Sequence, residues 1–312
     1  MISIIVCTYN RQKYIDKCLM SIANQTADKA SYELIIINNN SNDQSHDIIS
    51  DFISKQHKVI QCSYFIEENQ GLSFARNRGI KESIGNFYVF IDDDAFIEET
   101  YVTNLQTYLK QYGVDSIGFG GKIVPFLESA LPNWMSSFLM PLMSVIDKGE
   151  IVSEFSYQHY PIGANMGMSK RAIDEIGNFN VTLGRVGTNL IGGEEKDLFI
   201  RMKHAGFRIL YFPKIVAHHV VPDSRLTIDF IKQQAIGIGI SEIIRVNKEA
   251  GFSPLKRWLL ELYKWIGSFG LFFIYLFKGQ LSKGIMVIKF RWWVSIGMIR
   301  KATHQQSDVC SF

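Results

Sequence analysis

Short apolar runs alternate with segments of helical spacing through the first half of this 312-residue chain. Residues 2–7 form a continuous run rich in β-branched side chains, and residues 34–37 and 87–91 form two more apolar runs. Continuous runs of this kind are typical of strands that are buried on both faces of a parallel sheet. The alternation therefore predicts an α/β fold in which helices flank a mostly parallel sheet.

The second half of the chain is less regular. Glycine and proline interrupt residues 113–160, where we expect a strand followed by a mobile, aromatic-bearing segment. A strand over 163–169 is predicted to lead into a helix over 170–176. A short strand over 207–212 is predicted to end at Pro213, because proline cannot donate a hydrogen bond to a neighbouring strand.

Polar clusters follow three of the predicted strands at the point where each strand ends. They occupy residues 8–10, 38–43 and 92–94. In open α/β sheets, ligands bind outside the carboxyl ends of the strands. The three clusters therefore predict a binding site at one edge of the sheet.

The run Asp92-Asp93-Asp94 is the most distinctive of these clusters. Three adjacent carboxylates after a buried strand repel one another unless a cation compensates their charge. Oxygen ligands of this kind suit Mg²⁺ or Mn²⁺, which commonly share their coordination shell with substrate phosphates. A solvated acidic turn or a helix N-terminus is the alternative interpretation of the same residues.

Three other groups of residues are candidates for chemistry. Glu194 and Glu195 stand at a predicted helix start, where a carboxylate could accept a proton as a general base or could simply cap the helix. His218 and His219 follow a strand and could offer one imidazole to a metal. Arg76 could pair with a phosphate through its planar guanidinium, or could belong to an exposed cationic face.

Several well-known motifs are missing. The chain has no Gly-x-x-x-x-Gly-Lys phosphate loop, no Gly-x-Gly-x-x-Gly after its first strand, and no Gly-x-Ser-x-Gly nucleophile turn. Its formal net charge of +3 does not indicate a nucleic-acid partner. These observations argue against nucleoside triphosphatases of the phosphate-loop class, dinucleotide-dependent enzymes and serine hydrolases.

Five segments, taken together and in order, resemble the inverting glycosyltransferases of family 2, whose catalytic domain has the GT-A fold. They are residues 2–11, 33–41, 69–79, 92–94 and 193–198. The resemblance covers roughly residues 1–225. It implies transfer of a sugar from a nucleotide diphosphate sugar to an acceptor hydroxyl, with Mn²⁺ or Mg²⁺ as cofactor.

The resemblance also implies roles for individual residues. Glu195 would be the catalytic base with Glu194 beside it, and Asp94 would be the principal metal ligand, supported by Asp92 and by His218 or His219. The other implied residues bind substrates: Thr8, Tyr9, Asn10, Asn38, Asn39, Arg76, Asp92 and Asp93 for the nucleotide sugar, and Gly163, Ala164 and Asn165 for the pocket of the donor sugar and acceptor.

Two positions depart from the family pattern. Asn38 and Asn39 stand where the family usually has Asp, and an amide is both a donor and an acceptor of hydrogen bonds. Glu195 stands where the family carries Asp as the base, so the carboxylate reaches about one methylene further. Both departures lie in the substrate site, where they bear on base preference and on the position of the base.

The end of the chain has a different character from the rest. Residues 245–301 contain eleven Lys and Arg against two acids, a local charge of +9. Residues 258–277 are largely apolar, and residues 284–299 contain the pair Trp292-Trp293. Aromatic and cationic helices of this kind commonly lie in a membrane interface. A membrane hairpin over 258–299, a helical pair packed on the rest of the chain and a dimer contact are the alternatives.

These patterns together predict a catalytic domain over 1–225, with a nucleotide-binding half to about residue 112, an acceptor half over about 113–225, and a helical tail over 226–312.

The expected function is inverting sugar transfer in bacterial-type cell-surface polysaccharide or glycolipid assembly, with a hexose or an N-acetylhexosamine as the sugar. The expected partners are a nucleotide diphosphate sugar, a glycan or lipid-linked acceptor and an anionic membrane surface, with no nucleic acid. The four cysteines show no disulfide spacing, so the catalytic part is expected in the reducing cytoplasm. The basic tail is expected to hold it on the inner face of the cell membrane. A nucleotidyltransferase and a non-catalytic sugar-nucleotide binder are the alternative functions.

Overall fold

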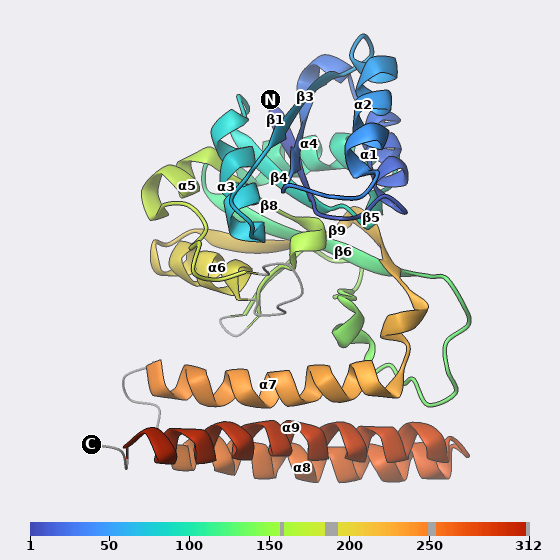
Figure 1. Ribbon diagram of the computed structural model, residues 1–312, viewed down its shortest axis with the longest axis vertical. Helices are drawn as coiled ribbons and strands as arrows, with labels where there is room; N and C mark the ends of the chain where they lie inside the picture. The colour runs from blue at the N-terminus through green and yellow to red at the C-terminus, as the bar shows by residue number, and fades with distance from the viewer. Residues whose placement is uncertain (157–158, 185–192, 249–253, 310–312) are drawn as a thin grey trace. The chain divides into compact units, whose positions relative to one another are not determined.

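The computed structural model describes residues 1–156, 159–184, 193–248 and 254–309 (Figure 1). The chain divides into two compact units. The first consists of residues 1–126 and 144–220, and the second of residues 127–143 and 221–312. The candidate site lies in the first unit.

The first unit is built on a nine-stranded sheet with the strand order β3-β2-β1-β4-β8-β6-β9-β5, in which β7 pairs with β9. Its first four strands are parallel to one another. These strands are β1 (Ile2–Thr8), β2 (Tyr32–Asn38), β3 (Gln61–Ile66) and β4 (Phe87–Asp92). Both neighbours of β1 are parallel strands, which agrees with its continuous apolar run.

The remaining strands join this parallel half in antiparallel pairs. They are β5 (Ala95–Ile97), β6 (Ile117–Leu127), β7 (Ser153–Glu154), β8 (Met166–Ser169) and β9 (Arg208–Val221). The predicted α/β class is confirmed, but the sheet is mixed, and the parallel arrangement holds only for β1 to β4. The antiparallel half depends on pairings between distant segments, which periodicity along the chain does not reveal.

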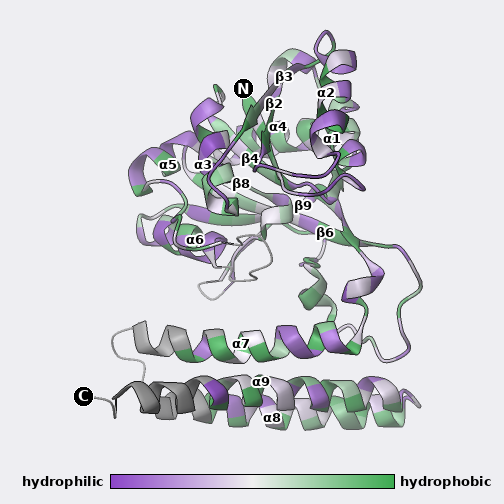
Figure 2. Ribbon diagram, in the orientation of Figure 1, coloured by the Kyte–Doolittle hydropathy of each residue, from purple (hydrophilic) through white to green (hydrophobic). Residues whose placement is uncertain are grey.

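Helices cover both faces of the sheet, and two apolar clusters lie beneath them. The alternation of strand side chains divides neighbours between the faces, so that Ile4 belongs to one cluster and Ile5 to the other. The central strands are hydrophobic in Figure 2. The helices are α1 (Ile15–Ala23), α2 (Ser45–Gln56), α3 (Leu72–Glu82), α4 (Tyr101–Tyr112), α5 (Lys170–Ile176) and α6 (Glu194–His204).

Two local predictions in the second half differ from the structure. The strand that was expected to end at Pro213 continues to Val221. Pro213 falls between the part of β9 that pairs with β7 and the part that pairs with β5, so its missing N–H interrupts neither pairing. Residues 163–169 are not one strand, because η3 (Gly163–Asn165) forms a 3-10 turn before β8.

The second unit is helical. It contains η2 (Met140–Met143), η4 (Asp223–Arg225), α7 (Ile228–Lys248), α8 (Pro254–Phe277) and α9 (Leu281–Val309). The segment 127–143 belongs to this unit as well, and Ser282 Oγ donates a hydrogen bond to the Asn133 carbonyl.

Candidate active site

The carboxyl ends of β1, β2 and β4 lie side by side, as the polar clusters predicted. Thr8 is the register partner of Asn38, and Cys7 is the register partner of Asp92. The Asn39 N–H donates to the Thr8 carbonyl at 2.8 Å, so the pairing continues into the loops. The loops after these strands therefore meet at one edge of the sheet.

The loop after β1 is held against the acidic run. The Tyr9 N–H donates to Asp93 Oδ2 at 3.3 Å. Asn10 has a φ of 53°, a left-handed conformation that asparagine tolerates better than most residues. Its Oδ1 accepts from the Asn42 N–H at 2.9 Å, which links the loops after β1 and β2.

The amides of Asn38 and Asn39 hold the second loop in shape. Asn38 donates to the Tyr64 hydroxyl at 2.9 Å and accepts from the Ser41 N–H at 2.8 Å. Asn39 donates to two backbone carbonyls after β3 and accepts from the Gly71 N–H at 2.8 Å. An aspartate at position 39 could not donate to these carbonyls, so the amide of Asn39 has a structural role in this chain. An aspartate at position 38 could instead accept from the Tyr64 hydroxyl.

Arg11 lies against the acidic turn. It was not among the site residues predicted from the sequence. Its Nε is 3.4 Å from Asp93 Oδ1, and its Nη2 is 3.4 Å from Asp94 Oδ2. The signal that could have identified it is its place in the first strand-end loop. A cation in that loop faces the acids at the end of a neighbouring strand.

Burial and mutual repulsion perturb the acids of this turn. Burial, together with the neighbouring Asp94, raises the pKa of Asp93 to about 7, against the opposing effect of Arg11. Burial raises the pKa of Asp92 as well, and Arg76 opposes that shift. Packed acids of this kind hold a proton unless a cation compensates them.

One histidine of the predicted pair joins the acids. His219 is buried, and its Nε2 lies 3.2 Å from Asp94 Oδ1. His218 faces the other side of β9, where its Nε2 lies 2.7 Å from Glu98 Oε1. Side chains alternate along a strand, so the two rings cannot share one site. Of the two histidines that the sequence left open, His219 is therefore the one that lies with the acids, and its role as a metal ligand stays a prediction.

The donor atoms of this group fit a divalent cation. Asp92, Asp94 and His219 each offer an atom within 4.8 Å of the others. Two carboxylate oxygens and one imidazole nitrogen suit Mn²⁺ well and Mg²⁺ acceptably. Since burial raises the pKa of Asp92, a cation bound there would favour the charged form of this carboxyl.

Arg76 on α3 connects the acidic turn with the start of α6. Its guanidinium is 2% exposed and lies 3.7 Å from Asp92 Oδ1 through Nη2. It also contacts Glu194 Oε1 at 3.0 Å and Glu195 Oε1 at 3.2 Å. One buried cation thus contacts three carboxylates. It orients Glu195 through a charge-assisted hydrogen bond, a contact that the predicted nucleotide role did not include.

Glu194 should make stability depend on pH. Burial and the neighbouring Glu195 raise its pKa to about 7. Between pH 4.5 and 7 the folded state then binds more protons at this site than the unfolded state, so the free energy of unfolding falls as pH rises. We expect a loss of roughly 2 kcal/mol from pH 5 to pH 8. Urea unfolding at both pH values should show a smaller loss for Glu194→Gln and an unchanged loss for Glu154→Gln, an exposed control. Equal losses in wild type and Glu194→Gln would contradict this role.

The segment Gly163–Asn165 is buried beside this group. Asn165 accepts from the Tyr101 hydroxyl at 2.7 Å and donates to the Lys122 and Ile215 carbonyls. Its side chain is 0% exposed and joins parts of the sheet, and its predicted place in a sugar pocket stays a prediction. Ala164 is also fully buried.

Gly163 leaves no room for a side chain. A Cβ at this position would lie 2.1 Å from Arg76 Nη2 and 2.8 Å from Glu195 Oε1. We expect Gly163→Ala to displace the guanidinium, lower stability by about 1–3 kcal/mol and reduce activity. Thermal unfolding and donor turnover measure the two effects. Gly237→Ala, where a Cβ meets nothing within 4 Å, is the control. An active Gly163→Ala of normal stability would show that the close approach is unimportant.

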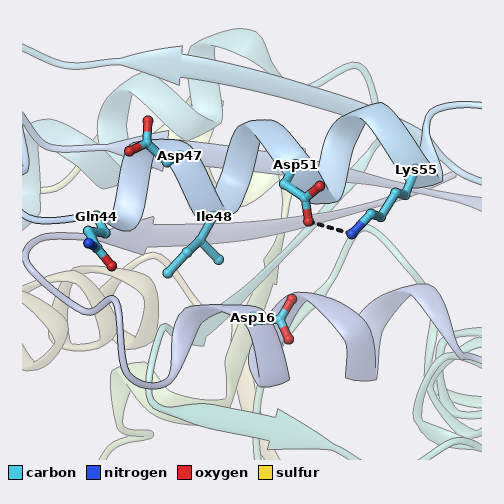
Figure 3. Close-up of a pocket in the computed structure, with 6 residues that line it drawn as sticks. All are labelled: Asp16, Gln44, Asp47, Ile48, Asp51 and Lys55. Carbon is cyan, nitrogen blue, oxygen red and sulfur yellow. Dashed lines mark hydrogen bonds and ion pairs between the residues drawn. The ribbon is translucent and has the colours of Figure 1, made fainter.

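A separate hollow of about 660 Å³ lies between α1 and α2 (Figure 3). None of the predicted site residues lines it, and Asp51 and Lys55 there form an ion pair on one helix face. Its lining residues are Asp16, Gln44, Asp47, Ile48, Asp51 and Lys55.

The mixed sheet, with an acidic turn at the end of β4 and two further acids at the start of α6, agrees with the expected GT-A fold. Residues 3–177 match the sequence model of glycosyl transferase family 2. This match covers more than half of the chain, and the chain belongs to that family.

Relatives and a solved structure agree with this assignment. The chain is 38% identical to the glycosyltransferase GlyA of Streptococcus pneumoniae over 114 residues, which is 36% of this chain and 16% of GlyA. It is 24% identical over 302 residues to a dolichyl N-acetyl-α-D-glucosaminyl phosphate 3-β-D-2,3-diacetamido-2,3-dideoxy-β-D-glucuronosyltransferase of Methanococcus voltae, covering 96% of this chain and 87% of the relative. The mannosyltransferase PcManGT of Pyrobaculum calidifontis, solved with GDP-Man and Mn²⁺, has a TM-score of 0.62 at 12% identity, with 96% of this chain and 86% of that chain covered. At 12% sequence identity, this structural similarity shows that the two chains share a fold, and it shows nothing further about function.

Proposed function

We propose that this protein transfers a sugar from a nucleotide diphosphate sugar to an acceptor hydroxyl, with inversion at the anomeric carbon. One observation carries the proposal. Arg76 links Asp92 of the candidate metal group to Glu195 at the start of α6, so that a donor site and a base lie at one sheet edge. Inversion in a single displacement requires such a base opposite the leaving group.

The residues divide the reaction between them. Glu195 accepts the proton of the acceptor hydroxyl while that oxygen bonds to the anomeric carbon and the bond to the diphosphate breaks. Arg76 holds the Glu195 carboxylate in place. Asp92, Asp94 and His219 would hold Mn²⁺ or Mg²⁺. The bound ion would neutralise charge on the departing nucleotide diphosphate. Thr8, Tyr9 and Asn10 would line the nucleotide.

We propose that the sugar is a hexose or an N-acetylhexosamine and that the acceptor is a glycan or a lipid-linked sugar. The name of the Methanococcus voltae relative describes a sugar attached to dolichyl phosphate as the acceptor, which supports a lipid-linked substrate. We place the reaction in cell-surface polysaccharide or glycolipid assembly, at the cytoplasmic face of the cell membrane. The basic, aromatic tail supports this location.

The proposal is tested by incubating the purified chain with UDP-, GDP- and dTDP-sugars, Mn²⁺ and a membrane lipid extract. We expect one donor to release its nucleoside diphosphate and to transfer its sugar to the extract. Release of pyrophosphate from a nucleoside triphosphate and a sugar phosphate would instead indicate a nucleotidyltransferase. Donor binding without turnover at any metal concentration would indicate a non-catalytic binder.

A further inference from the structure

The helices α8 and α9 form a hairpin whose polar groups face inward. The buried Arg291 guanidinium lies 3.3 Å from Glu261 Oε1 and donates to Ser268 Oγ at 3.3 Å. The Trp265 indole N–H donates to Ser295 Oγ at 3.1 Å. Glu261, Trp265 and Ser268 of α8 are therefore turned toward α9.

The opposite side of α8 is apolar and exposed. Its residues lie within about half of the helix circumference at 3.6 residues per turn. We call this surface the outer face of α8. Figure 2 shows hydrophobic residues along this helix. The outer face consists of Leu259, Leu262, Tyr263, Ile266, Phe269, Phe273, Ile274, Leu276 and Phe277, each between 40% and 86% exposed.

Helix α7 covers another side of α9, so the three helices run side by side (Figure 1). The crossing is close, because a Cβ on Gly239 would lie 2.1 Å from the Val294 carbonyl oxygen. A Cβ on Gly297 would lie 2.1 Å from the Ile236 carbonyl oxygen. Helix α9 is still only partly covered and leaves Leu281, Ile285 and Trp292 exposed. The outer face of α8 is exposed along its length within the described residues of the second unit.

The size and charge of this region indicate what covers the outer face. The segment Leu259–Phe277 is long and apolar enough to cross a membrane by length and composition alone, with a mean hydropathy of 1.3 and only 11% of its window buried. The surrounding residues 245–301 carry a charge of +9. An apolar helix face within a basic segment complements an anionic lipid surface.

We propose that α8 lies in the plane of an anionic lipid leaflet, with its outer face inserted among the acyl chains. Lys289 argues against a hairpin that spans the bilayer. It is exposed on α9, ten residues beyond Gly279 in the turn, which is about 15 Å along a helix. In a spanning hairpin it would lie near the middle of a hydrocarbon core of about 30 Å, where a lysine is costly. In the planar arrangement only α8 enters the apolar layer.

Vesicle flotation of the full chain tests the inserted face. We expect the wild type to float with vesicles of equal parts phosphatidylcholine and phosphatidylglycerol, and to float less with phosphatidylcholine alone. The double variant Phe269→Glu/Phe273→Glu should bind the anionic vesicles at least about tenfold more weakly. Ile84→Glu/Ile151→Glu, which adds the same charge to exposed apolar positions of the first unit, should bind like the wild type.

Unchanged flotation of the Phe269/Phe273 variant would overturn the proposal, as would equal binding of the wild type to neutral and anionic vesicles. A wild-type dimer that the variant converts to a monomer, without vesicle binding, would show that a second copy covers the face. Far-UV circular dichroism checks the helices, and Phe269→Ser/Phe273→Ser replaces the Glu variant if that variant is unfolded. The proposal rests on the membrane location in the proposed function, but none of these readouts depends on sugar transfer, so the two can fail separately.

Depth measurement tests the orientation. Nitroxide labels on Leu262→Cys, Phe269→Cys and Leu276→Cys, each combined with Cys310→Ser, report the depth of three turns of the outer face. A helix in the plane of the leaflet gives similar depths at all three positions. A label at residue 269 much deeper than the labels at 262 and 276 would show that α8 spans the bilayer.

Discussion

Glu195→Gln is expected to reduce the rate of sugar transfer roughly a thousandfold, because a neutral amide cannot accept the proton of the acceptor hydroxyl. The Gln carbonyl can still accept the hydrogen bond that Arg76 Nη2 donates to Glu195 Oε1. Folding and donor affinity should therefore be retained. The measurement is kcat at saturating donor and acceptor, with donor affinity measured separately.

Two further variants make this experiment specific. Asp197→Asn changes another acid in the first turn of α6, one that pairs with Arg201, and it should keep most of the activity. Glu195→Asp should retain more activity than Glu195→Gln, because it keeps a carboxylate and changes only its reach. If Glu195→Gln stayed within tenfold of the wild type, Glu195 would not be the base.

Asp94→Asn is expected to lower activity about a hundredfold or more, and to abolish the stabilisation that Mn²⁺ adds to nucleoside diphosphate binding. Asp94 Oδ1 faces His219 and its Oδ2 faces Arg11, so the substitution removes charge at the centre of the acidic turn. Turnover across a range of Mn²⁺ concentrations and the thermal midpoint with nucleoside diphosphate measure the two effects.

The two adjacent histidines supply the matched control. His219→Ala should weaken the dependence on Mn²⁺ in the same direction as Asp94→Asn, because its ring lies with the acids. His218→Ala should leave that dependence unchanged, because its ring pairs with Glu98 on the other side of β9. An equal loss of Mn²⁺ affinity in both histidine variants would argue against the group Asp92, Asp94 and His219 as the metal site.

Local signals predicted several elements well. The helix over 170–176 has the predicted bounds, because the Ser169 hydroxyl caps its start and Gly177, at φ 80°, ends it. The parallel strands β1, β2 and β4 were recognisable because burial on both faces requires an uninterrupted apolar run. The convergence of the strand-end clusters followed from the parallel arrangement.

Other features could not be derived from local signals. The antiparallel half of the sheet depends on which distant segments pair, and Pro213 continues a strand because its neighbours change at that point. Arg11 and Arg76 were ambiguous as isolated cations. Their roles follow from the carboxylates that the fold brings to them from other elements.

The sequence by itself determined the α/β class and the family, and it pointed to the sheet edge and the acids of the candidate site, because these depend on the order of residues along single strands and helices. The tertiary structure decided which histidine joins Asp94, that Asn165 joins parts of the sheet, and that Arg76 connects the candidate metal group to Glu195. Each of these depends on contacts between segments far apart in the chain. For the acidic turn at Asp92, the sequence supplied the charges, and the fold supplied the cations and the imidazole that face them.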